Sequence, residues 1–420
     1  MEKYQSFMEE YKSLKGIYYS DRENYGTEVE KRLNNPMTRF SGLEMYPFNI
    51  KTESREKTPF DIFYMPVVEI DTLKDEIFDH SKQIIEKMSK LPPVANDQLF
   101  FNTLIFELQS TNDIEGIRSS KKEIGEAVNT VINNSSKEGK RFIGLVNQYL
   151  KLRQGEFNAI TEIAEFRKIW NELVSEEEKE DAPDGKWFRK EPEAILNGDK
   201  VIHEGDPDEK AIIKDLRKLI IEMDGHYLPA IEKCFIAHYF YEYIHPFYDG
   251  NGRTGRFIVC AYLARKLDIL TAVSLSSTIS KNKNYYYKAF TEMSNKYNHG
   301  DATRFILKML NILIDGQKDI LNRLNEGIKL LNEAEEIISN CNLNDDMNNI
   351  LFLLFQEYIF GNYAPKLSDQ DMTETFHTSR YLFNKNITEL EAQGLVKTIN
   401  KRPIVHVLSK KLSDKIPQLH

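Results

Sequence analysis

Residues 229–266 of this 420-residue chain read PAIEKCFIAHYFYEYI, then HPFYDGNGRTGR, then FIVCAYLARK. The first segment has no breaker after its proline and is rich in apolar side chains, which predicts a buried helix over Pro229 to Ile244. Pro246 and three glycines interrupt that pattern, and Phe257 to Lys266 predicts a second, mostly apolar helix. Two helices joined by a glycine-rich turn therefore form the centre of the predicted fold.

The turn contains Gly250-Asn251-Gly252-Arg253-Thr254-Gly255, which matches the G-x-G-x-x-G string of dinucleotide-binding proteins. Those proteins need a strand before the glycines, whereas the preceding residues here have a helical pattern. The kinase version also fails, because the chain has no HRD or DFG string, and a Walker A string is absent. A helix, a glycine-rich loop and a second helix N-terminus instead point several N–H donors at one place. The turn therefore predicts a phosphate-binding site.

The side chains of the turn refine this prediction. Arg253 and Arg256 are three residues apart at a helix start, so both guanidinium groups can reach one polyphosphate. Asp249 would be repelled by phosphate unless a divalent cation lay between them, so its carboxylate indicates Mg²⁺. Asn251 can donate to a phosphoryl oxygen without adding charge. His245 supplies a base with an ordinary pKa near 6.5, suited to taking a proton from a hydroxyl.

These twelve residues resemble the Fic-domain motif, H-x-F-x-[DE]-G-N-G-R-x-x-R, at every fixed position from His245 to Arg256. The resemblance implies a mainly α fold, a Fic-type helical bundle with a small β-hairpin flap. It also implies transfer of AMP from ATP to a Ser, Thr or Tyr hydroxyl of a protein, with pyrophosphate leaving. His245 is then the catalytic base, Phe247 anchors the loop, and Asp249 holds Mg²⁺. The nucleotide would be held by Asp249, Gly250, Asn251, Gly252, Arg253, Thr254, Gly255 and Arg256.

A second string, Thr111-Asn112-Asp113-Ile114-Glu115-Gly116, closes a helical pattern that begins near Asp97. Thr111 and Glu115 are four apart and share a helical face, and Gly116 suits a left-handed helix end. Alone, this is an ordinary surface helix end. Beside the motif it resembles the family's inhibitory helix, [ST]-x-x-x-E-[GN], assigned here to residues 101–116. The resemblance implies that Glu115 pairs with Arg256 and hinders ATP binding, and in some relatives the same glutamate supports removal of AMP.

A hairpin is predicted where Ala194-Ile195-Leu196 and residues 200–202 flank Asn197-Gly198, a pair suited to a type I′ turn. It resembles the family's flap, which aligns a target segment by strand addition, and a plain surface hairpin is the alternative. Tyr286 and Tyr287 resemble a position beside the adenosine, as does Asn298. Because three tyrosines stand in a row here, a role in the core is equally consistent with the pattern.

Three regions are predicted along the chain: residues 1–69 of unassigned role, a Fic domain over 70–330, and a winged-helix domain over 345–420. The first contains a strand-like stretch, Phe60 to Ile70, where apolar residues partly alternate. Further helices are predicted over 121–173, 285–297 and 303–329. The winged helix is predicted from helices at 347–360, near 368 and at 378–393, followed by strands at 395–399 and 404–408.

Charge is polarised within this last region. Residues 377–411 hold seven basic and two acidic side chains, +5, whereas residues 350–376 hold one basic and four acidic, −3. This distribution is compatible with contact to DNA phosphates through Arg380, Lys385, Lys397, Lys401 and Arg402. Winged helices also serve as protein-interaction or dimer modules, so a homodimer is another possible assembly. A DNA-binding regulator that uses the Fic domain as a nucleotide sensor is the rival function.

Composition sets the broader limits. The net charge is 56 basic minus 65 acidic residues, or −9, which opposes nucleic-acid binding by the whole surface. No apolar run reaches the ~18 residues of a membrane span, and the N-terminus lacks a signal pattern, so we expect a cytoplasmic protein without a membrane partner. The expected partners are protein hydroxyl groups, including those of the chain itself.

Overall fold

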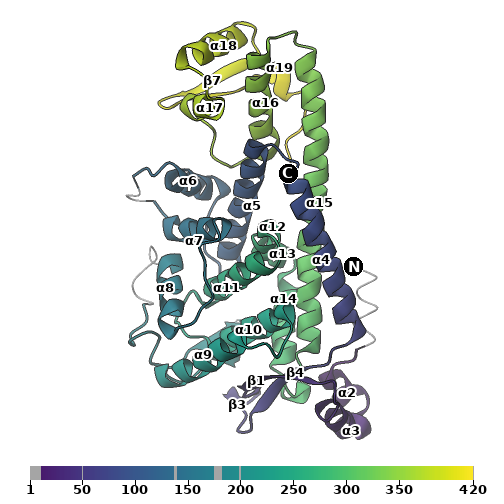
Figure 1. The fold of residues 1–420 in the computed structure, drawn as a ribbon. Coiled ribbons are helices and arrows are strands. Elements are labelled where there is room, and N and C mark those ends of the chain that lie inside the picture. Colours follow the sequence, from purple (N-terminus) through teal and green to yellow (C-terminus); the bar gives the residue numbers. More distant parts are fainter. Residues whose placement is uncertain (1–10, 50, 137–139, 175–181, 198–199, 420) are drawn as a thin grey trace. The chain divides into compact units, whose positions relative to one another are not determined.

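The computed structural model describes residues 11–49, 51–136, 140–174, 182–197 and 200–419 (Figure 1). The chain divides into two compact units. Unit 1 comprises residues 1–81, 110–118 and 144–317, and unit 2 comprises residues 82–109, 119–143 and 318–420. These units are not contiguous in sequence, unlike the three predicted regions, whose boundaries remain a prediction.

Unit 1 is built around helices α10 (Ala230–Ile244) and α11 (Asn251–Lys266), which pack against each other. Its remaining helices include α2 (Leu14–Ser20), α3 (Arg22–Leu33), α8 (Ile163–Val174), α9 (Glu209–Asp224), α12 (Ile269–Ala272), α13 (Leu275–Lys281), α14 (Lys283–Met293) and the short 3₁₀ helix η2 (Lys296–Asn298). Four helices contribute residues to both units: α4 (Val68–Met88), α5 (Pro93–Ile114), α7 (Ile143–Arg153) and α15 (Thr303–Ser339).

The predicted helices are present, but several differ in their limits, and α15 continues to Ser339, beyond the predicted end at residue 329. The expected helix at Phe257 starts earlier, at Asn251, because Gly250 adopts the left-handed φ of 79° and the helix begins directly after it. Gly252 and Gly255 are therefore helical, and among the three glycines only Gly250 interrupts the helical conformation. The predicted helical region 121–173 is three helices, α6 (Lys121–Ile132), α7 and α8, and the prediction at 285–297 corresponds to α14 followed by η2.

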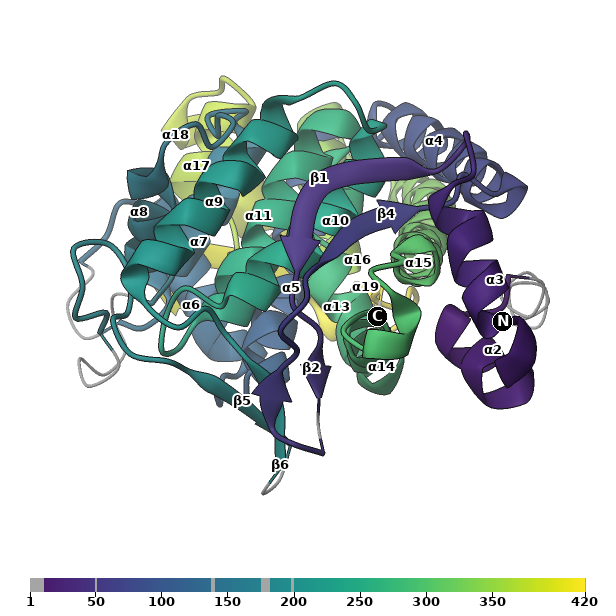
Figure 2. The same ribbon diagram turned by 90° about the horizontal axis from the view of Figure 1, so that it is seen from below.

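The strands of unit 1 form small antiparallel pairs, two of which lie in the N-terminal region (Figure 2). β1 (Arg39–Met45) pairs with β4 (Phe60–Tyr64), and β2 (Phe48–Asn49) pairs with β3 (Ser54–Arg55). The strand prediction for Phe60 to Ile70 is wrong beyond Tyr64, because α4 begins at Val68. The predicted hairpin is confirmed as β5 (Ala194–Asn197) and β6 (Lys200–Glu204), and turn residues 198–199 lie outside the described residues.

Unit 2 contains the predicted C-terminal order of helix, helix, helix and hairpin. The elements are α16 (Asp345–Phe360), α17 (Asp369–Thr375), α18 (Arg380–Ala392), β7 (Val396–Lys401), β8 (Ile404–Leu408) and α19 (Lys410–Ser413). α18 packs through an apolar face on which Phe383, Ile387 and Leu390 are buried. The assignment of this order to a winged helix remains a prediction.

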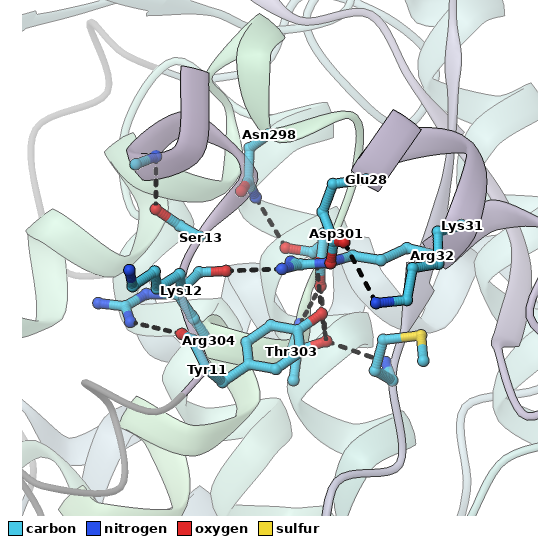
Figure 3. A network of polar contacts seen from close by, with 12 residues as sticks. Tyr11, Lys12, Ser13, Glu28, Lys31, Arg32, Asn298, Asp301, Thr303 and Arg304 are labelled. Atoms are coloured by element: carbon cyan, nitrogen blue, oxygen red, sulfur yellow. Dashed lines mark hydrogen bonds and ion pairs between the residues drawn. The ribbon is translucent and has the colours of Figure 1, made fainter. Parts of the chain in front are cut away.

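The N-terminal region is tied into unit 1 by a buried polar network around Asp301 (Figure 3). The Asp301 carboxylate accepts from the Tyr11 hydroxyl at 2.7 Å and from Arg32 Nη1 at 2.9 Å. The Arg32 guanidinium also lies 4.4 Å from the centre of the Tyr11 ring. The charges of Arg32 and Asp301 are both buried, so removing either residue would leave the charge of the other uncompensated. Among the described residues, no helix combines the length and apolar character needed to cross a bilayer.

Candidate functional site

The first element of the site is His245, the residue at which α10 ends. It adopts a left-handed backbone with φ of 53°, so the chain turns there away from the helix axis. Burial, together with the positive charge of Arg189, lowers the pKa of His245 to about 4. The imidazole is therefore neutral near pH 7, which is the form that can accept a proton.

The second element is the loop from Phe247 to Gly250, which the surrounding core holds in place. Phe247 is fully buried, and its ring stacks on Trp170 with centroids 5.0 Å apart. Asn251 fixes the same loop, because its Oδ1 accepts from the Phe247 N–H at 2.9 Å and its Nδ2 donates to the Phe247 carbonyl at 2.7 Å. Trp170 Nε1 donates to the Asp249 carbonyl at 2.7 Å. The N-terminus of α11 is thus presented by a rigid loop.

The third element is Arg256, one turn into α11, whose guanidinium is saturated by the end of α5. Its Nη1 contacts Glu115 Oε1 at 2.8 Å. Its Nε and Nη2 donate to Thr111 Oγ1 at 3.0 and 2.9 Å, and Nη2 also reaches the Thr111 carbonyl at 3.1 Å. A side chain built on Gly252 would collide with the Glu115 carboxylate. The expected Glu115–Arg256 pair is therefore present, with its anion directly above the start of α11.

A buried carboxyl lies behind this pair. Burial, together with the negative charge of Glu115, raises the pKa of Glu242 to about 8 against the attraction of Arg256. Glu242 is consequently mostly neutral at pH 7, which leaves Glu115 as the charged partner of Arg256. Burial opposes the charge of Arg256 itself, but the combined attraction of Glu115, Tyr286 and Glu242 outweighs that effect, so the pKa of Arg256 lies above its ordinary value.

Asp249 is the residue expected to hold Mg²⁺. Its side chain is 47% exposed and contacts Arg253 Nη2 through Oδ2 at 3.1 Å. The described residues contain no group of three or more His, Cys, Asp or Glu that could hold a metal alone. Mg²⁺ usually binds to one or two carboxylates together with substrate phosphates, so an accessible single carboxylate beside an anion site fits this ion.

The structure brings some predicted adenosine and flap residues toward the site and leaves one apart. Tyr286 is buried, and its hydroxyl lies 2.7 Å from His238 Nε2. Burial and the charge of Glu242 raise the pKa of Tyr286 against the effect of Arg256. Tyr287 is half exposed. Asn298 instead donates to the Asp301 carbonyl at 2.8 Å, within the network of Figure 3, and no described contact joins it to the glycine-rich loop. Its adenosine role remains a prediction.

The flap strand contains the predicted residues Ala194, Ile195 and Leu196. Leu196 is 61% exposed, so an apolar side chain of β5 faces solvent. β5 pairs only with β6 among the described strands, which leaves its other edge unpaired.

Gly116 has the predicted left-handed φ, 76°, just after the end of α5.

Sequence reasoning missed Arg189, which is fully buried beside the catalytic motif. Its Nε donates to the His245 carbonyl at 2.8 Å and its Nη2 to the Ile244 carbonyl at 3.3 Å. These carbonyls belong to the end of α10, where helical partners run out. A buried arginine there satisfies them and places positive charge at the negative end of the helix. Arg189 stands in the short string KWFRK, where it is one of three basic residues and nothing in the local pattern marks it as the buried one.

Comparison with known proteins agrees with this geometry. The Fic/DOC family model matches residues 160–263, which include α8, the hairpin, α10 and most of α11. The chain carries a Fic/DOC family domain. The "Protein adenylyltransferase Fic" of Nematostella vectensis is 36% identical to this chain over 87 residues, which are 21% of this chain and 18% of that protein. The matched segment thus spans less than a fifth of that relative.

Two solved structures are similar to this chain, and the first has a related fold. A Fic family protein from Desulfovibrio desulfuricans G20 has a TM-score of 0.50 at 19% identity, covering 82% of this chain and 97% of that one. Fic-1 from C. elegans has a TM-score of 0.43 at 16% identity, covering 62% and 73%. At these identities the first likeness bears on the fold alone. The Fic assignment, together with the mainly helical fold, is therefore confirmed.

Proposed function

We propose that this chain is a cytoplasmic protein adenylyltransferase that moves AMP from ATP to Ser, Thr or Tyr hydroxyls, including its own, and that Glu115 restrains it. The observation that carries the proposal is the Glu115 carboxylate lying on Arg256 above Gly252. A protein anion occupies the position that helix N–H groups and a guanidinium offer to a phosphate.

The transfer needs few covalent contributions from the protein. His245 would take the proton of the attacking hydroxyl, whose oxygen forms a bond to the α-phosphorus of ATP. The bond between that phosphorus and the bridging oxygen breaks, and pyrophosphate leaves with its electron pair. Arg253 and Arg256 would neutralise the phosphate charge. Asp249, together with phosphate oxygens, would hold Mg²⁺, which supplies further charge neutralisation.

The restraint follows from the geometry of Arg256. A triphosphate that binds over the α11 N-terminus competes with Glu115 for the same guanidinium and the same space. Nucleotide bound without displacing Glu115 would place its phosphates differently, which disfavours attack at the α-phosphorus. The same glutamate could position a water for removal of AMP, so the reverse activity belongs to this proposal.

The direct test is mass spectrometry of the Glu115→Gly protein after incubation with ATP and Mg²⁺. We expect an added AMP group on the protein, and none in the Glu115→Gly/His245→Ala double variant. A Glu115→Gly protein that incorporates no AMP into itself or into proteins of a cell extract would contradict the proposal. Incorporation that persists without His245 would contradict the assigned base.

The C-terminal region supports a second candidate function, binding of DNA. Five cationic side chains lie exposed on α18 and the β7–β8 hairpin: Arg380, Lys385, Lys397, Lys401 and Arg402. Among the described residues, none of the five forms an ion pair with a carboxylate, so their charge is available to phosphates. A gel-shift titration at two salt concentrations tests this candidate.

Variants separate the two functions. Arg380→Ala and Lys401→Ala should each weaken DNA binding and reduce the salt dependence by about one counterion. Lys329→Ala, an exposed lysine on α15, serves as the matched control. His245→Ala should abolish AMP transfer and leave DNA affinity unchanged. Absence of any shift at low salt would refute DNA binding without affecting the enzymatic proposal.

A further inference from the structure

The N-terminal region, which the sequence leaves without a role, contacts the flap through Arg55 at the end of β3. Arg55 Nε and Nη2 donate to the Glu204 carbonyl at 3.1 and 2.6 Å. Its Nη1 forms an ion pair with Asp206 Oδ1 at 3.0 Å, in which Asp206 is buried and Arg55 is largely so. Glu204 is the last residue of β6, so this one side chain holds the exit of the flap at two points.

The same guanidinium lies against the helix that ends in the catalytic base. Arg55 Cζ is 4.6 Å from the centre of the Tyr243 ring, two residues before His245. The Tyr243 hydroxyl accepts from the backbone N–H of Tyr46, also in the N-terminal region. On the other side of Tyr243, its carbonyl is 2.8 Å from Nε2 of His203 in β6. Tyr243 is thus fixed between the N-terminal region and the flap.

Contacts continue from the flap exit to His245 itself. The Asp206 N–H donates to the Ile244 carbonyl at 2.9 Å. Gly205 approaches so closely that a Cβ there would lie 2.9 Å from the His245 Cβ. Because Arg55 holds Glu204 and Asp206, the residues on either side of Gly205, it determines how the flap exit lies against the backbone of His245.

We propose that Arg55 is a positioning residue for His245 and for the β5–β6 flap, so that the N-terminal region forms part of the catalytic architecture. The consequence for the reaction rests on the proposed AMP transfer, whereas the structural consequence does not. A fork-shaped guanidinium is needed because two acceptors, the Glu204 carbonyl and the Asp206 carboxylate, are held at once. Lysine can neutralise Asp206 but cannot reproduce both contacts.

The test compares Arg55→Met and Arg55→Lys with Arg39→Met, which changes an exposed arginine of the same region. Amide hydrogen exchange of β5 and β6 and the NMR signals of the His245 ring are measured in the full chain. We expect Arg55→Met to speed exchange of the flap amides at least tenfold and to shift the His245 signals. Arg55→Lys should give an intermediate effect and Arg39→Met none.

Kinetics in the Glu115→Gly background provide the second readout, with labelled AMP incorporation into the protein as the assay. Arg55→Met should lower kcat at least tenfold and leave KM for ATP unchanged, because the phosphate cradle does not involve Arg55. Unchanged flap exchange and His245 signals in Arg55→Met would overturn the proposal, as would equal effects of Arg39→Met. If Arg55→Met does not fold, the proposal is overturned by an Arg55→Lys protein whose flap amides exchange at the wild-type rate. If the Glu115→Gly protein transfers no AMP, the exchange and NMR results still decide.

Discussion

Replacing Glu115 by glycine should release Arg256 and accelerate AMP transfer. At 2.8 Å, two unit charges attract with about 6 kcal/mol at an effective dielectric of ~20, which is an upper limit. The Glu115 side chain is 23% exposed, and solvent reduces the attraction toward the ~1 kcal/mol of a surface pair. A net value of about 2 kcal/mol lies between these limits and corresponds to a rate gain of about 30-fold at subsaturating ATP.

The assay is incorporation of labelled AMP into the full-length protein, measured as an initial rate over a range of ATP concentrations. Glu115→Gln keeps the shape and loses the charge, so we expect a smaller gain, about 5- to 10-fold. Asp113→Asn removes an exposed carboxylate two residues away and should change nothing. Equal rates for the wild-type and Glu115→Gly proteins would refute the reasoning, and so would an Asp113→Asn gain as large as that of Glu115→Gly.

Three further predictions concern protons and metal. Because the pKa of His245 is lowered to about 4, AMP transfer should keep its rate from pH 7.5 to 5.5, and a half-maximal rate near pH 6.5 would contradict this. His238 has a folded-state pKa of about 3 caused by burial, so only the unfolded chain takes up its proton below pH 6.5; the unfolding free energy should fall by about 2 kcal/mol on this account between pH 7 and 5. Urea titrations should find that this fall in unfolding free energy is absent in His238→Gln. It should remain in His226→Gln, which changes an exposed histidine and serves as the control. Asp249→Asn should raise the Mg²⁺ concentration for half-maximal AMP transfer at least tenfold, whereas Asp224→Asn, at an exposed acid elsewhere, should not.

The catalytic loop could be predicted because its residues are contiguous. Twelve neighbouring positions contain the proposed base, the proposed metal ligand and both arginines, and a turn between two helices forces them together. The Glu115–Arg256 contact joins residues 141 apart in the sequence, and helical spacing alone would not have paired them. There the resemblance to a family motif supplied what local pattern could not.

The parts that escaped prediction are contacts between segments that look ordinary in sequence. Arg189 is one of three basic residues in the string KWFRK, and its burial arises only where the end of α10 leaves carbonyls without partners. Trp170 reaches the Asp249 carbonyl from 79 residues away. The start of α11 was placed too late for a different reason, since glycines usually end helices. Here the left-handed Gly250 starts one, and the glycines that follow leave room for an anion.

In the proposed function, that room ties the restraint by Glu115 to the binding of nucleotide. Gly252 has no side chain, so the space above the α11 N-terminus accepts either a phosphate or the Glu115 carboxylate, and a larger residue would exclude both. A phosphate would compete with Glu115 for Nη1 of Arg256, because Thr111 already takes its Nε and Nη2. Thr111 therefore holds the guanidinium in place whichever anion is bound. A mutation that weakened nucleotide binding at Arg256 would weaken the restraint as well, so the level of restraint can be adjusted independently only from the α5 side, through Glu115.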